Sequence, residues 1–231
     1  MLAVLDSGEG GRLTLAMLRR FVKKEDITLL MDTENCPYGE KSPEELLAIV
    51  KSRVKALRAL GARLVLLGCC TASTVYPMLP EELRRVTLPI IRATALRAVS
   101  LSENGRIALL ATEATVSSGA FDKYADCLSL SSLAAPELVR AVESGECDLR
   151  HAKNTEDKLD LLLSRLCRSG EDTLILGCTH FPALERTAAR LAARYGVRHT
   201  VSSVREGAIL TLALMGEEYR ENGRDIILQR I

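Results

Sequence analysis

Two cysteines occupy equivalent positions in two similar segments that lie about half a chain apart. Cys69 follows Gly61 by eight residues in "GARLVLLGCCTAS", and Cys178 follows Gly170 by eight residues in "GEDTLILGCTHFP". In both segments an apolar run and a glycine come before the cysteine, and a threonine comes soon after it. A lone cysteine at such a point would most simply be a small apolar filler. The repetition instead favours two thiols that act together.

A pair of facing thiols suits the inversion of a carbon centre that carries an acidic hydrogen. One group removes the α-proton of an amino acid from one face, and the other delivers a proton to the opposite face. Because the two enantiomers have equal free energy, the site must serve both directions, with the roles exchanged. Two equivalent acid–base groups on two equivalent structural units meet that need. The pattern therefore indicates amino-acid racemisation.

Short apolar runs alternate with longer amphipathic stretches, which is typical of parallel strands buried on both faces. The expected strands are Leu2–Leu5, Ile27–Met31, Leu64–Leu67, Val86–Ile91, Ile107–Ala111, Leu174–Leu176 and Val197–Val201. Helices are expected at Arg12–Lys23 and Pro43–Leu60. The second begins with Ser42, Pro43 and Glu45 in the pattern of a capping box. This order of elements predicts an α/β fold with doubly wound sheets.

The repeated segment predicts two pseudo-symmetric doubly wound lobes, with mainly parallel sheets and an active site in the cleft between them. We expect residues 1–92 to form an N-terminal lobe that carries Cys69. Residues 93–207 should form a second lobe that carries Cys178. Residues 208–231 are expected to form a helical segment that packs back on the first lobe.

Polar side chains accompany both cysteines at the ends of expected strands, where ligands of open α/β sheets bind. Helix starts at such points favour negative charge, so we expect a lowered thiol pKa. Asp6 ends the first strand of the first lobe and should point into the cleft, although "DSG" also fits a capped turn. His180, in the second lobe, lies two residues after Cys178 and could exchange a proton with that thiol, or could be a surface histidine.

The glycine-rich turn "GEGG" tempts a dinucleotide-binding interpretation. That fingerprint requires a third glycine where this chain has Leu13. We expect the turn instead to bring backbone N–H groups close to a carboxylate.

The composition narrows the choice of partners and compartment. The 231 residues carry a net charge of +1, from 31 basic and 30 acidic residues without a block of like charge, which gives no reason to expect nucleic acid or an anionic membrane. Aromatic residues make up 3% and tryptophan is absent, which argues against base-stacking surfaces. No apolar run reaches the length of a membrane span, and the start "MLAVLDSG" does not resemble a signal peptide. We therefore expect a cytoplasmic protein.

Seven cysteines in a reducing compartment are expected to be free thiols. Four of them lack the strand-end setting and are expected to be apolar fillers: Cys36, Cys127, Cys147 and Cys167.

Six motifs extend over nearly the whole chain: "LDSGEGG" (5–11), "DTENCPYGEKS" (32–42), "GCCTAS" (68–73), "ATEATVSSGAF" (111–121), "APELVRAVESG" (135–145) and "LGCTHFP" (176–182). Their order and approximate spacing resemble those of the glutamate racemases, within the cofactor-independent aspartate/glutamate racemase superfamily. The resemblance implies a two-lobed isomerase without cofactor or metal. It further implies that the enzyme interconverts L- and D-glutamate, supplies D-glutamate for peptidoglycan, and forms a homodimer.

The resemblance also implies roles for single residues. Cys69 and Cys178 match the two catalytic thiols, Asp6 and His180 match the polar residues that assist one thiol each, and Glu143 matches an acidic residue that supports the histidine. The positions that match substrate contacts are Asp6, Ser7, Pro37, Tyr38, Gly39, Cys70, Thr71, Thr115, Thr179 and His180.

The chain departs from the pattern of these enzymes at a few positions. Cys70 stands where an asparagine is usual, and a thiol is a poor substitute for an amide that donates two hydrogen bonds. In "APELVR" the usual cysteine and second proline are replaced by Ala135 and Arg140, and "VSSVREGA" replaces a more familiar Asp-Ser. These departures leave open a homologue that acts on another amino acid, such as aspartate, or a non-catalytic amino-acid-binding protein.

Two other chemistries are weaker alternatives. Cys69, Cys70, Cys178 and His180 could converge on a zinc ion, but neither segment has the two-residue spacing common in structural zinc sites. A pyridoxal-dependent racemase is not supported, since no lysine stands in the strand-end motifs "LDSGEGG", "GCCTAS" and "LGCTHFP".

Overall fold

A computed structural model describes residues 1–20, 27–124, 129–144, 152–215, 219–221 and 224–226. In its N-terminal half, four parallel strands form a sheet in the order β2-β1-β3-β4. These strands are β1 (Leu2–Asp6), β2 (Ile27–Met31), β3 (Leu64–Leu67) and β4 (Thr87–Pro89). The central strands β1 and β3 therefore deliver the polar residues that follow them to one edge of the sheet.

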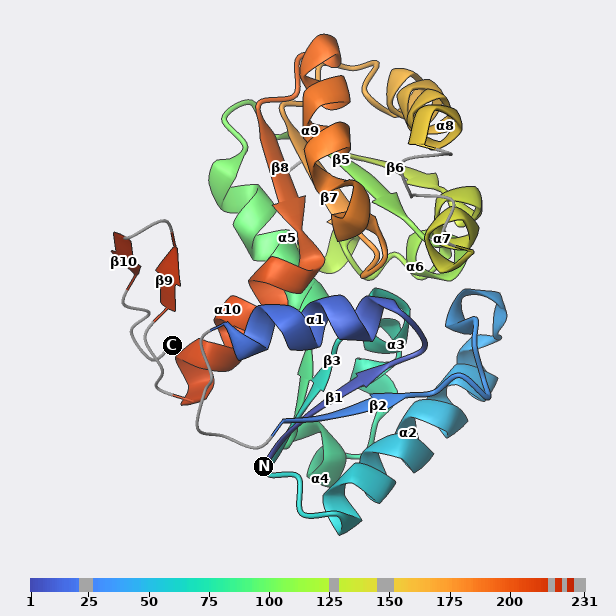
Figure 1. Ribbon diagram of the computed structural model, residues 1–231, viewed down its shortest axis with the longest axis vertical. Helices are drawn as coiled ribbons and strands as arrows, with labels where there is room; N and C mark the ends of the chain where they lie inside the picture. The colour runs from blue at the N-terminus through green and yellow to red at the C-terminus, as the bar shows by residue number, and fades with distance from the viewer. Residues whose placement is uncertain (21–26, 125–128, 145–151, 216–218, 222–223, 227–231) are drawn as a thin grey trace.

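A second sheet has the same topology, with four parallel strands in the order β6-β5-β7-β8. Its strands are β5 (Arg106–Ala111), β6 (Ser129–Ala134), β7 (Thr173–Gly177) and β8 (His199–Ser202). The sheets lie in two separate lobes of the molecule (Figure 1). Because β3 and β7 hold equivalent places in the two sheets, Cys69 and Cys178 follow equivalent strands, and the predicted fold class is confirmed.

Helices cover both faces of each sheet. They are α1 (Gly10–Arg19), α2 (Pro43–Ala59), α3 (Cys70–Thr74), α4 (Glu81–Arg84), α5 (Ile90–Leu101), α6 (Glu113–Ser117), α7 (Pro136–Glu143), α8 (Ala152–Leu166), α9 (Glu185–Ala192) and α10 (Ser203–Met215). Short 3-10 turns are η1 (Tyr38–Glu40), η2 (Tyr76–Met78), η3 (Asp122–Tyr124), η4 (Phe181–Leu184) and η5 (Ala193–Tyr195). No helix within the described ranges is long and apolar enough to cross a membrane.

Alternate residues of the central strands pack into separate cores, as expected for strands buried on both faces. On one face of the first sheet, Leu5 and Leu67 pack with residues of α2. On the other, Val4 and Leu66 pack with Leu18 of α1 and with α10. In the second sheet, α8 and α9 cover one face and α5 covers the other.

The chain passes between the lobes in two helices. α5 starts directly after β4 of the first sheet and packs on the second, whereas α10 starts after β8 of the second sheet and packs on the first. α10 contacts both α1 and α5, and lies at the junction of the lobes (Figure 1). The expected boundaries at 92/93 and 207/208 thus fall inside helices, and we retain the division into lobes 1–92 and 93–207 as a proposal.

Several elements differ from the expectation. The strand expected at Val86–Ile91 ends at Pro89, since proline lacks the N–H of a strand ladder and Ile90 begins α5. Of the segment expected to be helical at 208–231, the residues up to Met215 belong to α10. Tyr219–Glu221 (β9) and Arg224–Ile226 (β10) instead pair as antiparallel strands.

Two expected helices agree with the structure in most of their length. α2 carries the predicted capping box, in which the Ser42 side chain accepts from the Glu45 N–H and the Glu45 carboxylate accepts from the Ser42 N–H. α1 ends at Arg19, and the last residues of the helix expected at Arg12–Lys23 lie outside the described residues.

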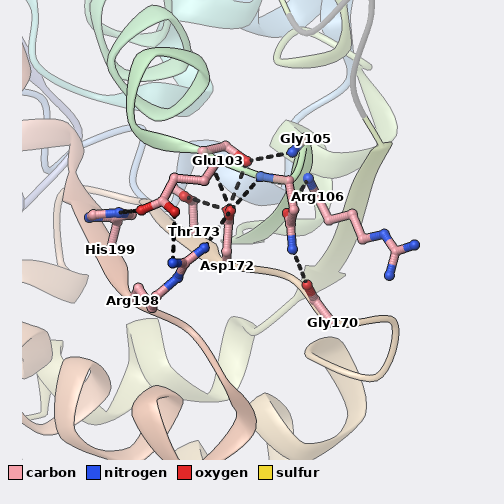
Figure 2. Close-up of polar contacts among 10 residues, drawn as sticks. Glu103, Gly105, Arg106, Gly170, Asp172, Thr173, Arg198 and His199 are labelled. Carbon is pink, nitrogen blue, oxygen red and sulfur yellow. Dashed lines mark hydrogen bonds and ion pairs between the residues drawn. The ribbon is translucent and has the colours of Figure 1, made fainter.

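A buried carboxylate fixes the far end of the second lobe, at the start of β7. Asp172 accepts hydrogen bonds from the backbone N–H groups of Glu103 and Asn104 at 2.7 and 2.8 Å and from two hydroxyls, and Arg198 lies nearby (Figure 2). Although burial raises the pKa of this carboxyl, these hydrogen bonds hold it below its ordinary value. The cluster ties the turn after α5 to β7, the strand that Cys178 follows.

Candidate active site

A cavity of about 320 Å³ lies between the lobes and is lined by residues of both. This is within the usual range for a small-molecule site. Nine sequence-predicted residues line it: Ser7, Pro37, Tyr38, Gly39, Cys69, Thr71, Glu143, Cys178 and His180. Asp6, Cys70, Thr115 and Thr179 were also predicted but are not among the lining residues.

Cys69 follows β3 and stands directly before α3, where its side chain is 7% exposed. The Ser7 hydroxyl lies 4.0 Å from its sulfur. Burial, together with the nearby Asp6 carboxylate, raises the pKa of the Cys69 thiol to about 12. The expected lowering of the pKa by a helix start is therefore wrong, because a five-residue helix contributes less than desolvation takes away.

Cys178 directly follows β7 and is the first of three polar groups that are hydrogen-bonded in a row. The Cys178 sulfur lies 3.4 Å from Nδ1 of His180, and Nε2 of His180 lies 2.8 Å from Oε1 of Glu143. A carboxylate only accepts, so Nε2 of His180 donates to Glu143, and Nδ1 faces the Cys178 thiol. Burial raises the pKa of the Cys178 thiol well above its ordinary value. The structure therefore brings Cys178, His180 and Glu143 together, as predicted. The pKa of Cys178, like that of Cys69, is raised and not lowered as expected.

Asp6, the last residue of β1, is fully buried, and its hydrogen bonds join the two lobes. Its carboxylate accepts from the Gly8 N–H at 3.1 Å and from the Thr179 hydroxyl of the second lobe at 3.0 Å. Burial raises the pKa of Asp6 to about 6, even though the Gly8 N–H, His180 and Thr179 oppose the rise. A Cβ atom at Gly10 would collide with Thr179, so the glycine-rich turn allows this close approach of the lobes.

Three threonine hydroxyls form a cluster between the lobes. Thr71 lies 2.9 Å from Thr112 and 3.3 Å from Thr115, and the Thr112 and Thr115 hydroxyls are 2.8 Å apart. Thr112, which the sequence reasoning missed, lines the cavity and caps α6. The sequence pattern that could have identified Thr112 is its place directly after an expected strand and three residues before Thr115, where a threonine often caps a helix.

The segment that brings Tyr38 and Gly39 to the cavity is held in place by hydrogen bonds to Asp32. The buried Asp32 accepts from the Tyr38 hydroxyl at 2.8 Å and from Arg53 at 2.9 Å. Although burial raises the pKa of Asp32, its hydrogen bonds from Arg53, Tyr38 and Asn35 hold it below the ordinary value. Sequence reasoning did not single out this carboxylate.

The remaining cysteines have different surroundings. Cys36, expected to be an apolar filler, lines the cavity, and its sulfur lies 3.7 Å from Oε1 of Glu143. Burial and Glu143 raise its pKa to about 11. Cys167 is buried in the core of the second lobe, as expected of a filler, whereas Cys127 and Cys147 lie outside the described residues.

Cys70 is fully buried and packs with Ile90 and Ile91, away from the cavity lining. Its position does not favour the zinc alternative, which needs its sulfur to converge with the cavity thiols. Within the described ranges, no three or more His, Cys, Asp or Glu side chains are grouped so that they could hold a metal ion.

Comparison with known proteins places the chain in a family. The family model of the Asp/Glu/hydantoin racemases matches residues 14–209. The chain belongs to the Asp/Glu/hydantoin racemase family. It is therefore an isomerase, a racemase, and the resemblance found in its motifs is confirmed.

Members of this family with known names are similar to the chain over most of its length. It is 37% identical to a glutamate racemase of Desulforudis audaxviator over 81% of this chain and 70% of that protein. It is 32% identical to a glutamate racemase of Oceanobacillus iheyensis over 98% of this chain and 83% of that protein. The crystal structure of a glutamate racemase isoform from Bacillus anthracis superposes with a TM-score of 0.83 and 28% identity, covering 93% of this chain and 81% of that one.

Proposed function

We propose that this racemase interconverts L- and D-glutamate without a cofactor, by proton transfer between two thiols and the α-carbon. The observation that carries the proposal is that Cys69 of the first lobe and Cys178 of the second line one cavity. The named relatives, all glutamate racemases, support glutamate as the substrate. The expected catalytic roles of Asp6, His180 and Glu143 are part of the proposal.

Each direction of the reaction needs one thiolate and one thiol. The thiolate takes the α-proton, forming an S–H bond, while the electron pair of the C–H bond passes to the α-carbon and its carboxylate. The other thiol gives its proton to the opposite face, which leaves the mirror-image amino acid and a thiolate on the second side. The enzyme then carries its charge on the other sulfur.

The raised pKa values mean that both thiols rest in the protonated form, and a neighbour must accept a proton from one of them. His180 is hydrogen-bonded to Cys178 and oriented by Glu143, so it serves that sulfur. Asp6, whose pKa is about 6, is largely ionised at neutral pH and serves Cys69. The Thr71 and Thr112 hydroxyls, which line the cavity, are suited to hold the α-carboxylate.

The thiol pair is tested by replacing Cys69 or Cys178 with alanine. We expect racemisation to fall about 10²–10⁴-fold in both directions in each variant, because the loss of either acid–base group stops inversion. Circular dichroism of L- and D-glutamate measures racemisation, and proton NMR in deuterated solvent measures exchange of the α-hydrogen. A panel with aspartate and other amino acids tests the substrate.

Cys36→Ala is the matched control, since Cys36 is a third thiol of the same cavity that the mechanism does not use. We expect it to retain most of the activity. Near-normal racemisation by Cys69→Ala or Cys178→Ala would rule out the two-thiol mechanism. Exchange with aspartate and none with glutamate would redirect the substrate assignment.

The cellular role follows from the family resemblance and is likewise our proposal. We expect the protein to act in the cytoplasm as a homodimer and to supply D-glutamate for peptidoglycan. We expect glutamate, and neither nucleic acid nor membrane, as its partner.

A further inference from the structure

The charges around the cavity are unevenly distributed. Glu40, Glu113 and Glu143 line it, and the first two are exposed at its rim. Among the described residues that line the cavity, Arg140 is the one lysine or arginine. Among these lining residues, the guanidinium of Arg140 is thus the one lysine or arginine charge available to a second carboxylate of a substrate, beside three glutamates that would repel it.

Arg140 lies on α7, three residues before Glu143, and its side chain is exposed. Within the described parts of the chain it makes no side-chain hydrogen bond or ion pair, whereas Glu143 is bonded to His180. A guanidinium presents several N–H donors in a planar fork that matches a carboxylate. Arg140 therefore has its full binding capacity available to a ligand in the cavity.

Pro136 and Val139 of the same helix also line the cavity and are apolar. They offer an apolar surface for the methylene groups of a substrate side chain. This surface lies next to Arg140, whose guanidinium would bind a carboxylate at the end of that side chain. The reacting α-carbon has to lie near the two buried thiols, so a side chain that extends towards the exposed Arg140 points to the rim.

We propose that Arg140 binds the side-chain carboxylate of the substrate and so makes the enzyme selective for acidic over neutral amino acids. The inference rests on the proposed function, because it takes an amino acid to be the occupant of the cavity. In "APELVR" this arginine replaces the usual proline, so the role belongs to this chain's own sequence and not to the pattern it resembles.

Arg140→Gln removes the charge and keeps most of the side-chain volume. The probe is glutarate, a dicarboxylate that cannot react, with binding measured by isothermal titration calorimetry. We expect Arg140→Gln to weaken glutarate binding about 10–100-fold, the loss typical of a hydrogen bond to a charged group. Arg140→Lys should fall between, because it keeps the charge and loses the fork.

Kinetics provide a second readout that a surface role of Arg140 would not alter. In Arg140→Gln we expect KM for glutamate to rise with kcat nearly unchanged, and the preference for glutamate over glutamine to fall by a similar factor. Arg165→Gln, which removes an exposed arginine of α8 in the same lobe, is the matched control and should change neither.

The outcomes separate this inference from the proposed function. If glutamate is racemised by the wild type and Arg140→Gln behaves like Arg165→Gln, the inference is wrong and the proposed function stands. If glutarate binding depends on Arg140 but no α-hydrogen exchanges in glutamate, the inference stands and the proposed function fails. A wild type that binds no glutarate overturns the inference directly.

Discussion

The buried carboxyl of Asp6 works against folding at neutral pH. Its pKa rises from 3.8 to about 6 in the folded chain, so the folded protein binds this proton more tightly than the unfolded chain does. The stability that the protonated form contributes is fully present below about pH 4 and is lost as the pH rises through about 6. At higher pH the ionised Asp6 lowers the free energy of unfolding by about 3 kcal/mol, which is the free-energy equivalent of this pKa shift.

Asp6→Asn should therefore stabilise the protein while it impairs catalysis. Above pH 7 we expect its free energy of unfolding to exceed that of the wild type by about 2–3 kcal/mol, with the difference disappearing below pH 4. Urea denaturation across this pH range measures the difference. Racemisation should also fall, because Asp6 is the proton acceptor that we propose for Cys69. Asp157→Asn, at an exposed carboxylate of α8, is the control. A stability difference that does not change with pH would contradict the argument.

At this scale the sequence predicts which residues meet, but not their protonation. The repeated segment and the motifs identify Cys69, Cys178, His180 and Glu143, all of which line the cavity. The raised thiol pKa values were not predictable, because they depend on how completely the second lobe covers the first. The sequence also did not indicate that Cys70, the first residue of α3, is buried in a core while Cys69 before it lines the cavity.

The loop between β2 and α2 illustrates how one buried charge positions a whole segment. Residues 32–42 carry Tyr38 and Gly39 to the cavity, and Asp32 holds them by accepting from Tyr38 and Arg53. The turn that carries Tyr38 and Gly39 into the cavity lining thus depends on a carboxylate that itself does not line the cavity.

Asp32→Ala is expected to destabilise the protein by about 1–3 kcal/mol, because it leaves the buried Tyr38 hydroxyl without its acceptor. KM for glutamate should rise as the loop relaxes. Urea denaturation and steady-state kinetics measure the two effects. Tyr38→Phe removes the hydroxyl but keeps Asp32 bonded to Arg53, so it should lower the free energy of unfolding by less than Asp32→Ala does. If the double variant shows the sum of the two single losses, the Asp32–Tyr38 bond does not anchor the loop.

Elements were predictable where the local pattern was strong. The capping box located the start of α2 correctly, and continuous apolar runs located the central strands. The edge strand β6 was missed because its sequence "SLSSLA" is half serine, and partial exposure at the sheet edge tolerates this. Its existence depends on pairing with β5, which a local pattern does not encode.

For the whole molecule, the pseudo-symmetry of the two lobes was predictable from the sequence, but the way in which α5 and α10 connect the lobes was not. Two similar segments imply two similar lobes, and the two sheets share one topology. Nothing in a single segment says that α5 and α10 carry the chain across and pack on each other. Their contact includes Gly207, whose neighbour across the junction is Ile90.

Gly207→Ala is expected to disturb the placement of the lobes. A Cβ atom there would lie 2.5 Å from Cγ1 and 2.6 Å from Cδ1 of Ile90, closer than side chains pack. Ile90 is fully buried, so we expect α5 and α10 to move apart to make room. Overpacking of this kind costs about 1–3 kcal/mol. Because Cys69 and Cys178 sit on different lobes, we also expect kcat to fall. Urea denaturation and racemisation kinetics measure the two effects.

Ile90→Ala provides the matched test, since it removes both atoms that the new methyl group would meet. Alone it should cost about 2–5 kcal/mol, as large-to-small changes in a core do. In the double variant, the cavity left by Ile90→Ala accepts the methyl group that Gly207→Ala introduces. The double variant should therefore be more stable than the sum of the two single losses predicts. Its kcat should recover part of what Gly207→Ala loses. Additive losses in stability and no recovery of kcat would mean that the α5–α10 contact does not set the distance between the thiols.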